Sequence, residues 1–387
     1  MAGSRGRGAL LAAVLVVALA VPVALFLGRG SSVRAEFLPA AGGSSPAHSP
    51  TPAPSARQLA GERVIYSYPG KTPPASLLTA IRHGEAAGVI FFSDNVSSPK
   101  QLHQVADRLQ RAAAQSPLHK PLLLLTDQEG GEIRRLPGAP EQSAKQVGQA
   151  ADPTAAAGAT GTGAARTLKG AGLNGNLAPV LDVYRHNGDL MDQYGRSYGT
   201  DPGTVGSLGS TFVTSQQKAG VLATAKHFPG LGPAGTDQNT DERPVTLHTS
   251  ASTLRGTDER PYQQAIAAGV SMVMASWAVY PALDPDHPAG MSSTIIHGEL
   301  RDRLGYKGVT VTDAMEAGAL KSYGGTGKRA VAAAGAGMDL LLCSGRDASQ
   351  GAAAVDALAR AYRSGALDRA DFTAAADRVT ALRGTLS

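Results

Sequence analysis

The 387-residue sequence has a single cysteine, few aromatic residues (5%) and few charged residues (17%). With only Cys343 available, no disulfide can form within the chain, so the fold must depend on its hydrophobic core, which a chain of this length can bury. Cys343 lies in the apolar run MDLLLC, where nothing nearby would stabilise a thiolate, and we interpret it as a core residue. The chain also lacks a stripe of Lys and Arg interleaved with aromatics, which argues against nucleic-acid binding.

The N-terminus carries a long apolar run. Residues 9–27 form 19 residues without a charge, which is long for the core of a signal peptide and just long enough to span a bilayer. Residues 33–35 fit a small-x-small cleavage site. Residues 1–35 are therefore predicted to be a signal anchor, slightly favoured, or a cleaved signal peptide, and the protein is expected to be exported. Most of the formal net charge of +5 belongs to arginines that flank the run: Arg5, Arg7, Arg29 and Arg34.

Residues 36–57 are dense in Pro, Ala, Ser and Gly, which predicts a disordered linker. Residues 58–387 are predicted to form one folded domain. Contact with a membrane is expected only through the N-terminal segment, and the sequence makes no prediction of oligomeric state.

Within the predicted domain, eight short apolar runs alternate with stretches of helical periodicity. The runs lack polar/apolar alternation, which suits strands buried on both faces of a parallel sheet. Eight strand–helix units in about 330 residues predict a (β/α)8 TIM barrel. The predicted strands are residues 63–67, 88–92, 121–126, 176–182, 222–228, 271–276, 308–313 and 338–343.

Each apolar run is followed at once by a polar or glycine-rich patch. In a barrel the carboxyl ends of the strands meet at one mouth, where active sites are built. Asp313 ends the seventh run. A carboxylate there could attack a sugar anomeric carbon and form a covalent glycosyl-enzyme, or it could cap the following helix.

Lys226 and His227 end the fifth run and could donate hydrogen bonds to sugar hydroxyls. Adjacent residues of a strand point to opposite faces, so only one of them is expected to enter the barrel unless the strand ends there. No second histidine stands at ligand spacing, so no metal site is predicted.

Asp127 opens the segment TDQEGGEIRRL, whose paired glycines permit a tight turn. After this turn, either Arg134 or Arg135 could direct its guanidinium group into the same pocket. Glu129 and Glu132 are interpreted as solvent-facing charges.

Several strings in this order resemble glycoside hydrolase family 3, in its single-domain β-N-acetylglucosaminidase (β-hexosaminidase) branch. They are GVIFFSDN, LLLLTDQEGGEIRRL, NLAPVLDV, YGRSYG, AKHFPGLG, YQQAIAAGVSMVMASWAVYPALD and GMSSTIIHGELRDRLGYKGVTVTDAMEAGAL, and they cover roughly residues 60–345. The combination of DQEGG, KHFPG and the long string LRDRLGYKGVTVTD is specific to that family.

The resemblance implies a retaining double displacement with Asp313 as nucleophile and no metal or organic cofactor. It also implies that members act on N-acetylglucosamine-containing glycans, chiefly peptidoglycan fragments, so a glycan substrate is the expected partner. The residues implied to bind the sugar, or in the case of Met274 to lie beside it, are Asp127, Arg135, Arg196, Lys226, His227 and Met274.

The sequence departs from the family pattern in the loop KHFPGLGPAGTDQNTDERP. Members of this branch carry an Asp–His pair there as general acid/base. Asp237 can stand for the Asp of that pair, but the His position is Asn239, which cannot transfer a proton in this role. The position of a second family histidine is Leu231.

Three interpretations of this loop remain open. Another carboxylic acid, among Asp237, Asp241 and Glu242, could serve if burial raised its pKa. His248 could move in, or the protein could be a weakened or inactive glycan-binding relative. A family 3 β-glucosidase-like activity is a further alternative, but its acid usually comes from a second domain, and only about 45 residues follow the eighth run.

Overall fold

The computed structural model of the protein describes residues 53–386. The predicted signal or anchor segment, residues 1–35, and most of the predicted linker lie outside the described residues. Helix α1 (Ala56–Gly61) begins two residues before the predicted domain boundary, because Ser55 caps it by accepting a hydrogen bond from the backbone N–H of Gln58. Within residues 53–386, no helix combines the length and the apolar character that a membrane crossing requires.

The described residues fold into a closed barrel of eight parallel strands, as predicted. The strands follow one another around the barrel in chain order, and the last pairs with the first. They are β1 (Val64–Tyr66), β2 (Gly88–Ile90), β3 (Leu123–Thr126), β6 (Gly175–Asn176), β7 (Leu222–Phe228), β8 (Met272–Ala275), β11 (Val309–Ala314) and β12 (Leu340–Leu342). Each lies in or at the edge of a predicted run.

The fourth barrel strand, β6, is much shorter than the predicted run 176–182. Pro179 has no backbone N–H, so a regular ladder cannot continue through it. Beyond β6 the chain still follows β7, since the N–H of Leu181 donates to the carbonyl of Lys226 at 2.7 Å.

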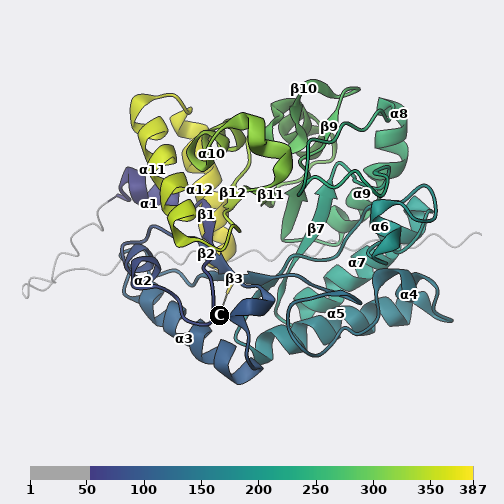
Figure 1. The fold of residues 1–387 in the computed structure, drawn as a ribbon, viewed down its shortest axis with the longest axis horizontal. Coiled ribbons are helices and arrows are strands. Elements are labelled where there is room, and N and C mark those ends of the chain that lie inside the picture. Colours follow the sequence, from purple (N-terminus) through teal and green to yellow (C-terminus); the bar gives the residue numbers. More distant parts are fainter. Residues whose placement is uncertain (1–52, 387) are drawn as a thin grey trace, which may run out of the picture. The chain divides into compact units, whose positions relative to one another are not determined.

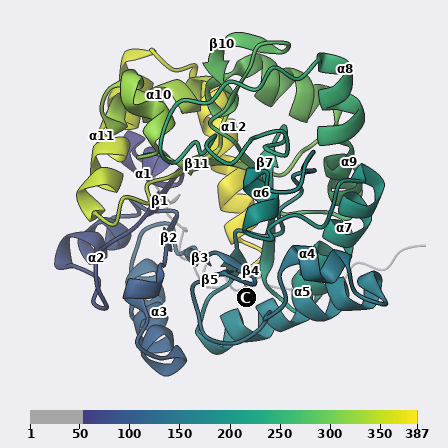
Figure 2. The same cartoon turned by 45° about the vertical axis from the view of Figure 1, so that its right-hand side comes forward.

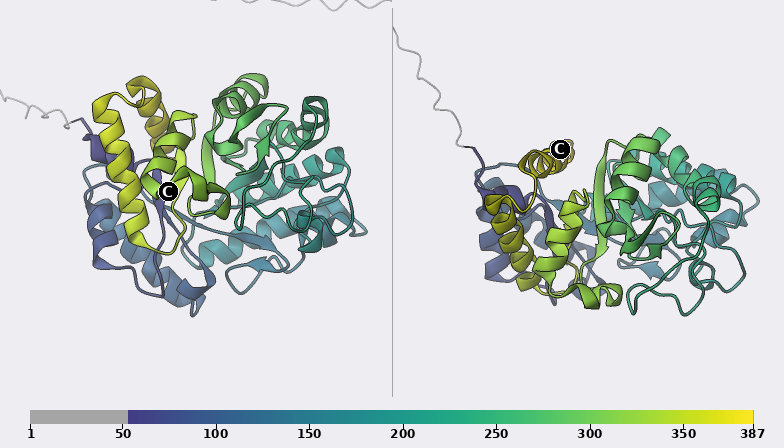
Figure 3. Two further views of the ribbon diagram at one scale, coloured as in Figure 1. Left: turned by 45° about the horizontal axis from the view of Figure 1, so that its top comes forward. Right: turned by 90° about the horizontal axis from the view of Figure 1, so that it is seen from above.

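Helices surround the barrel (Figures 1 and 2). The longest are α3 (Pro99–Ala114), α5 (Pro153–Gly170), α7 (Pro202–Lys218), α11 (Ala348–Ser364) and α12 (Arg369–Arg383). The shorter ones are α2 (Ala75–Arg82), α4 (Ala144–Gly148), α6 (Leu190–Gln193), α8 (Ala251–Thr253), α9 (Arg260–Ala267) and α10 (Thr326–Gly335). Further helical turns are η1 (Ser93–Asn95), η2 (Leu254–Asp258), η3 (Ala289–Met291), η4 (Thr294–Arg303) and η5 (Gly318–Tyr323). Figure 3 shows α1 beside α11, near the seam where the first strand pairs with the last.

Two small hairpins stand apart from the barrel sheet. One pairs β4 (Gln128–Gly130) with β5 (Ile133–Arg134), and the other pairs β9 (Val279–Tyr280) with β10 (Asp284–Pro288). The first hairpin follows β3 directly and therefore lies at the carboxyl end of the barrel.

Alternate residues of β1, β2, β3, β8, β11 and β12 fill the barrel interior with apolar side chains. This interior cluster includes Ile65, Ile90, Leu123, Leu125, Leu177, Met272, Met274, Val309, Val311, Leu340 and Leu342. Full burial of each such side chain contributes about 1.5–3 kcal/mol to stability. Val379 of α12 joins the same cluster. Arg383 of the same helix donates to the carbonyls of Lys120 and Pro121, which precede β3, so the C-terminal helix covers the amino-terminal end of the barrel. Cys343 is also fully buried, as predicted, and burial raises the pKa of its thiol.

Candidate active site

Side chains of a strand alternate between its two faces, so the inward-facing side chains of each barrel strand form a row that continues to the open mouth of the barrel. Val309 and Val311 of β11 point into the interior, and Asp313 is the next residue on that face. Leu123 and Leu125 of β3 lead in the same way to Asp127. Buried apolar rows therefore end in carboxylates at one end of the barrel.

These residues line a cavity of about 480 Å³ at the mouth. Seven of the predicted site residues line it: Asp127, Arg135, Arg196, Lys226, His227, Met274 and Asp313. The rest of the lining is Ile90, Phe92, Glu129, Ile133, Leu177, Asp241, Ala314, Glu316, Ala317, Leu342, Ser344, Gly345 and Arg346. Asp237 is not part of the lining and is exposed.

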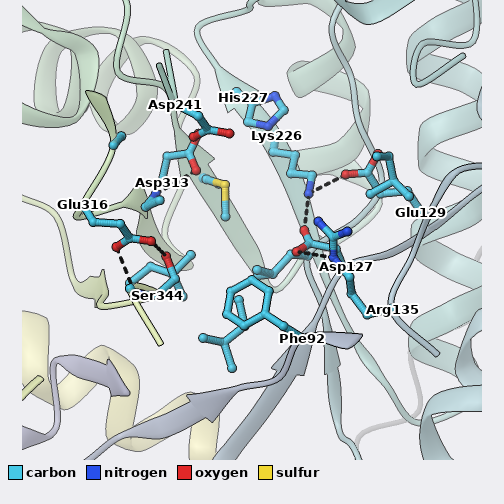
Figure 4. A pocket seen from close by; sticks show the side chains of 18 of the residues that line it. Phe92, Asp127, Glu129, Arg135, Lys226, His227, Asp241, Asp313, Glu316 and Ser344 are labelled. Atoms are coloured by element: carbon cyan, nitrogen blue, oxygen red, sulfur yellow. Dashed lines mark hydrogen bonds and ion pairs between the residues drawn. The ribbon is translucent and has the colours of Figure 1, made fainter. Parts of the chain in front are cut away.

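A dense ionic cluster forms one side of the cavity (Figure 4). The Nζ of Lys226 lies 2.7 Å from Oδ1 of Asp127 and 2.7 Å from Oε1 of Glu129. Glu129 also forms a two-point ion pair with Arg196, with N–O distances of 2.9 and 2.8 Å. Because Lys226 is buried, these two carboxylates are what keep it charged: burial acts to lower its pKa, but Asp127 and Glu129 raise it.

The prediction that Glu129 faces solvent is wrong, because its side chain is only 7% exposed. Burial disfavours its charged form, but Arg196 and Lys226 outweigh that effect and hold the pKa of Glu129 well below its usual range. The signal was present in the sequence: Asp127 and Glu129 are two residues apart, so an extended chain directs both to one side. Glu132 is exposed, as predicted.

Lys226 and His227 both line the cavity, although they are adjacent in β7. The pairing of β7 with β8 is irregular between Ala225 and Phe228, and such a bulge redirects side chains from strict alternation. The peptide bond between Lys226 and His227 is cis. Within residues 53–386, no cluster of three or more His, Cys, Asp or Glu side chains is placed to hold a metal ion.

Arg135, rather than Arg134, reaches the cavity. Arg134 donates to the carbonyls of Gly131 and Gly138, which holds the hairpin turn. The Nε of Arg135 is buried without a hydrogen-bond partner and lies 3.9 Å from Oδ2 of Asp127. A free guanidinium donor at the wall of a cavity suits a polar ligand.

The carboxylate of Asp313 lies across the cavity from the ionic cluster (Figure 4). Its Oδ1 accepts a hydrogen bond of 2.7 Å from the backbone N–H of Ala314, the next residue of β11. Met274 stands on the neighbouring strand β8, where it pairs with Val311 and is 2% exposed. The carboxylate of Asp313 is thus oriented into the cavity, beside the apolar surface of Met274.

A second carboxylate, Asp241, stands next to Asp313 at the mouth (Figure 4). Asp241 is exposed at the rim of the mouth, but the protein around its carboxyl group and the negative charge of Asp313 both disfavour its ionised form, and together they raise the pKa of Asp241 to about 6. The sequence placed Asp241 among three candidate loop acids. Of these, the structure brings only Asp241 to the cavity lining.

Sequence reasoning did not single out the wall formed by Phe92, Glu316, Ser344 and Arg346. Glu316 accepts a hydrogen bond of 2.7 Å from the hydroxyl of Ser344. The guanidinium of Arg346 lies 4.8 Å from the ring centre of Phe92. Phe92 and Ser344 each lie two residues beyond an inward-facing residue, Ile90 and Leu342, so the same alternation rule could have identified them.

Comparison with known proteins agrees with this geometry. The family model described as glycosyl hydrolase family 3 N terminal domain matches residues 64–382. A protein of Arthroderma benhamiae described as an uncharacterized secreted glycosyl hydrolase is 48% identical over 330 residues, which span 85% of this chain and 93% of that protein. A beta-hexosaminidase of Xanthomonas oryzae pv. oryzae is 33% identical over 269 residues, which span 68% of this chain and 77% of that protein.

Solved structures with the same fold are also similar in sequence. A glycoside hydrolase family 3 beta-N-acetylglucosaminidase from Paenibacillus is 34% identical with a TM-score of 0.80, and the match covers 86% of this chain but only 63% of that protein. A beta-N-acetylhexosaminidase from Beutenbergia cavernae is 31% identical with a TM-score of 0.78, and the match covers 85% of this chain and 98% of that protein.

Proposed function

The chain belongs to glycoside hydrolase family 3 and is a glycoside hydrolase; we propose that it removes terminal β-linked N-acetylglucosamine from glycans and retains the anomeric configuration. The observation that carries this proposal is the arrangement of the cavity. One wall holds a carboxylate, Asp313, free of any ionic partner within hydrogen-bonding distance among the described residues, and the opposite wall holds paired cations and carboxylates. The beta-hexosaminidase and beta-N-acetylglucosaminidase relatives support the choice of sugar.

In this proposal Asp313 is the nucleophile. Its carboxylate oxygen attacks the anomeric carbon, the bond from that carbon to the leaving-group oxygen breaks, and a covalent glycosyl-enzyme forms. Water then attacks the same carbon, and its oxygen replaces Asp313. Two inversions give net retention.

The ionic cluster holds the sugar in the position for attack. Asp127 offers carboxylate oxygens as acceptors for sugar hydroxyls, while Lys226, Arg135 and Arg196 offer donors. His227, whose Nδ1 faces Asp182, offers Nε2 to the sugar as an acceptor. Glu129 is already occupied by Lys226 and Arg196, so its role is to hold those two cations in place. Met274 supplies an apolar surface beside the ring.

The setting of this activity is proposed to be outside the cell, on cell-wall-type glycans such as peptidoglycan fragments. The similarity to a protein described as secreted supports export. A glycan is then the partner of the folded domain, with no nucleic acid and no metal or organic cofactor proposed. Membrane attachment, through residues 1–35 alone, remains a proposal from the sequence.

One observation favours a second candidate, a weakened or inactive glycan-binding protein: Asn239 stands where the family has a proton-transferring histidine. The two candidates differ in turnover. Residues 53–387 should release the aryl alcohol from an aryl β-N-acetylglucosaminide, much faster than from the matching aryl β-glucoside, and Asp313→Ala should abolish release. Sugar binding by calorimetry without any release from either glycoside would contradict the hydrolase and favour the binding protein.

A further inference from the structure

Asn239 is engaged in the loop itself. Its side-chain Oδ1 accepts a hydrogen bond of 3.0 Å from the backbone N–H of Asp241, and its Nδ2 lies 3.3 Å from Oε1 of Glu242. Its backbone carbonyl accepts from the N–H groups of Glu242 and Arg243, each at 3.1 Å. This is the local side chain-to-backbone pattern by which asparagine builds turns. Asn239 therefore shapes the turn that carries Asp241 and does not line the cavity.

The turn is fixed to the segment that follows the proposed nucleophile. The N–H of Gly318 donates to the carbonyl of Asp241 at 2.7 Å, and the N–H of Ala319 donates to the carbonyl of Thr240 at 3.0 Å. The two backbones are so close that a Cβ on Gly318 would lie 2.1 Å from the carbonyl oxygen of Glu242. Thr240 is buried at 3% exposure. The position of Asp241 is thus set by backbone contacts on both sides.

This placement brings two carboxyl groups together on one wall of the cavity, where Figure 4 shows Asp241 directed toward Asp313. On the basis of this geometry, and resting on the proposed glycosidase function, we infer that Asp241 is the general acid/base of the reaction. It takes the place of the histidine that is absent at position 239. Asp237, four residues earlier, is exposed like Asp241 but does not line the cavity.

The electrostatics of the mouth suit this role. Removal from water, Asp313 and Glu316 all favour the protonated form of Asp241, while His227 and Arg196 oppose it, and the net effect raises its pKa to about 6. An acid that is protonated in part near neutral pH can give a proton in one step and regain it in the next. When the glycosyl-enzyme forms, the carboxylate of Asp313 becomes an ester and loses its negative charge. The pKa of Asp241 then falls, so Asp241 stays ionised and can act as the base in the second step.

Asp241 gives up its proton in the first step and regains one in the second. As Asp313 attacks the anomeric carbon, the carboxylic acid of Asp241 transfers its proton to the departing oxygen, which leaves as an alcohol. In the second step the carboxylate of Asp241 takes a proton from water, and the resulting hydroxyl bonds to the anomeric carbon. Asp313 departs as a carboxylate, and Asp241 is again protonated.

The test compares two leaving groups in residues 53–387. With phenyl β-N-acetylglucosaminide, which needs protonation, Asp241→Asn should lower kcat/KM by about 10²–10⁴-fold. With a dinitrophenyl leaving group, which departs unaided, kcat/KM should change little. The kcat of Asp241→Ala on the dinitrophenyl substrate should fall, because no base activates water in the second step. Azide needs no base, so it should restore this kcat and yield a β-glycosyl azide. The fall in wild-type kcat/KM as pH rises above about 6 should be absent in Asp241→Asn.

Glu242→Gln is the matched control, since Glu242 is adjacent, exposed and outside the cavity lining, and it should behave as the wild type. Equal losses on both leaving groups in Asp241→Asn would indicate a structural role and overturn the assignment. The leaving-group pattern appearing in Asp237→Asn instead would overturn it in favour of Asp237. A wild-type protein that cleaves neither substrate would overturn the proposed function together with this inference, whereas an active wild type with an unaffected Asp241→Asn would overturn the inference alone.

Discussion

Oδ2 of Asp182 lies 2.7 Å from Nδ1 of His227, and the imidazole lines the cavity with its Nε2 3.5 Å from Nη2 of Arg196. Asp182 is fully buried, and its Oδ1 also accepts from the backbone N–H of Leu231 at 2.7 Å. A buried carboxylate at Nδ1 keeps the proton on that nitrogen and leaves Nε2 as an acceptor when the ring is neutral.

We therefore predict that Asp182→Asn lowers kcat/KM through the orientation of His227. An asparagine whose oxygen keeps the bond to Leu231 presents an N–H to Nδ1 and moves the imidazole proton to Nε2. The expected loss is about 10–100-fold, the range seen when such supporting partners are removed. Nitrogen-15 NMR of the imidazole should report the change of tautomer. An unchanged tautomer with unchanged kcat/KM would contradict the role given to Asp182.

Glu129 is predicted to be essential to the cavity, because it compensates two cations. Glu129→Gln leaves Arg196 and buried Lys226 short of one negative charge, and loss of one partner of a buried pair typically destabilises a protein by about 3–5 kcal/mol. Urea unfolding should show a lower midpoint, and KM should rise. Glu132→Gln, at an exposed position of the same hairpin, is the control and should match the wild type. Equal unfolding midpoints for the two variants would refute this prediction.

Gly318 is predicted to tolerate no side chain, because its Cβ position is occupied by the carbonyl of Glu242. Gly318→Ala should displace the turn that carries Asp241 and lower kcat on substrates with poor leaving groups more than on activated ones. Gly298→Ala is the control, since nothing lies within 4 Å of its Cβ position. Loss of activity in both variants, or in neither, would argue against the docking of this loop as the cause.

The buried carboxyl group of Asp258 should make the free energy of unfolding depend on pH. It is fully buried and, although Nη2 of Arg185 lies 2.6 Å from its Oδ2, burial raises its pKa to about 7. In the unfolded chain an Asp titrates near about 3.9. Between about pH 4 and 7 the native state therefore holds a proton that the unfolded state releases, so the free energy of unfolding should fall as pH rises. Asp258→Asn should flatten this fall, whereas exposed Asp302→Asn should not. Parallel pH profiles for wild type and Asp258→Asn would contradict the prediction.

The barrel was predictable from the sequence because its signal is local: a strand buried on both faces must be an uninterrupted apolar run, as at 121–126 and 308–313. Lys226 and His227 were found as a pair, but their shared orientation was not, since a strand irregularity depends on pairing with β8. Glu129 was misjudged because its burial comes from Lys226 and Arg196, which lie far away in the chain. The choice among the loop acids needed the contact with Gly318 and Ala319, which no local pattern reveals.

The proposed mechanism depends most directly on the identity of the nucleophile. Incubation with a fluorinated, slowly hydrolysed β-N-acetylglucosaminyl substrate, followed by proteolysis and mass spectrometry, should place one glycosyl adduct on the peptide that contains Asp313. Fragmentation should locate it on that carboxylate, and Asp313→Asn should form no adduct. An adduct on another carboxylate, or steady turnover with release of the inverted anomer and no adduct, would contradict this mechanism.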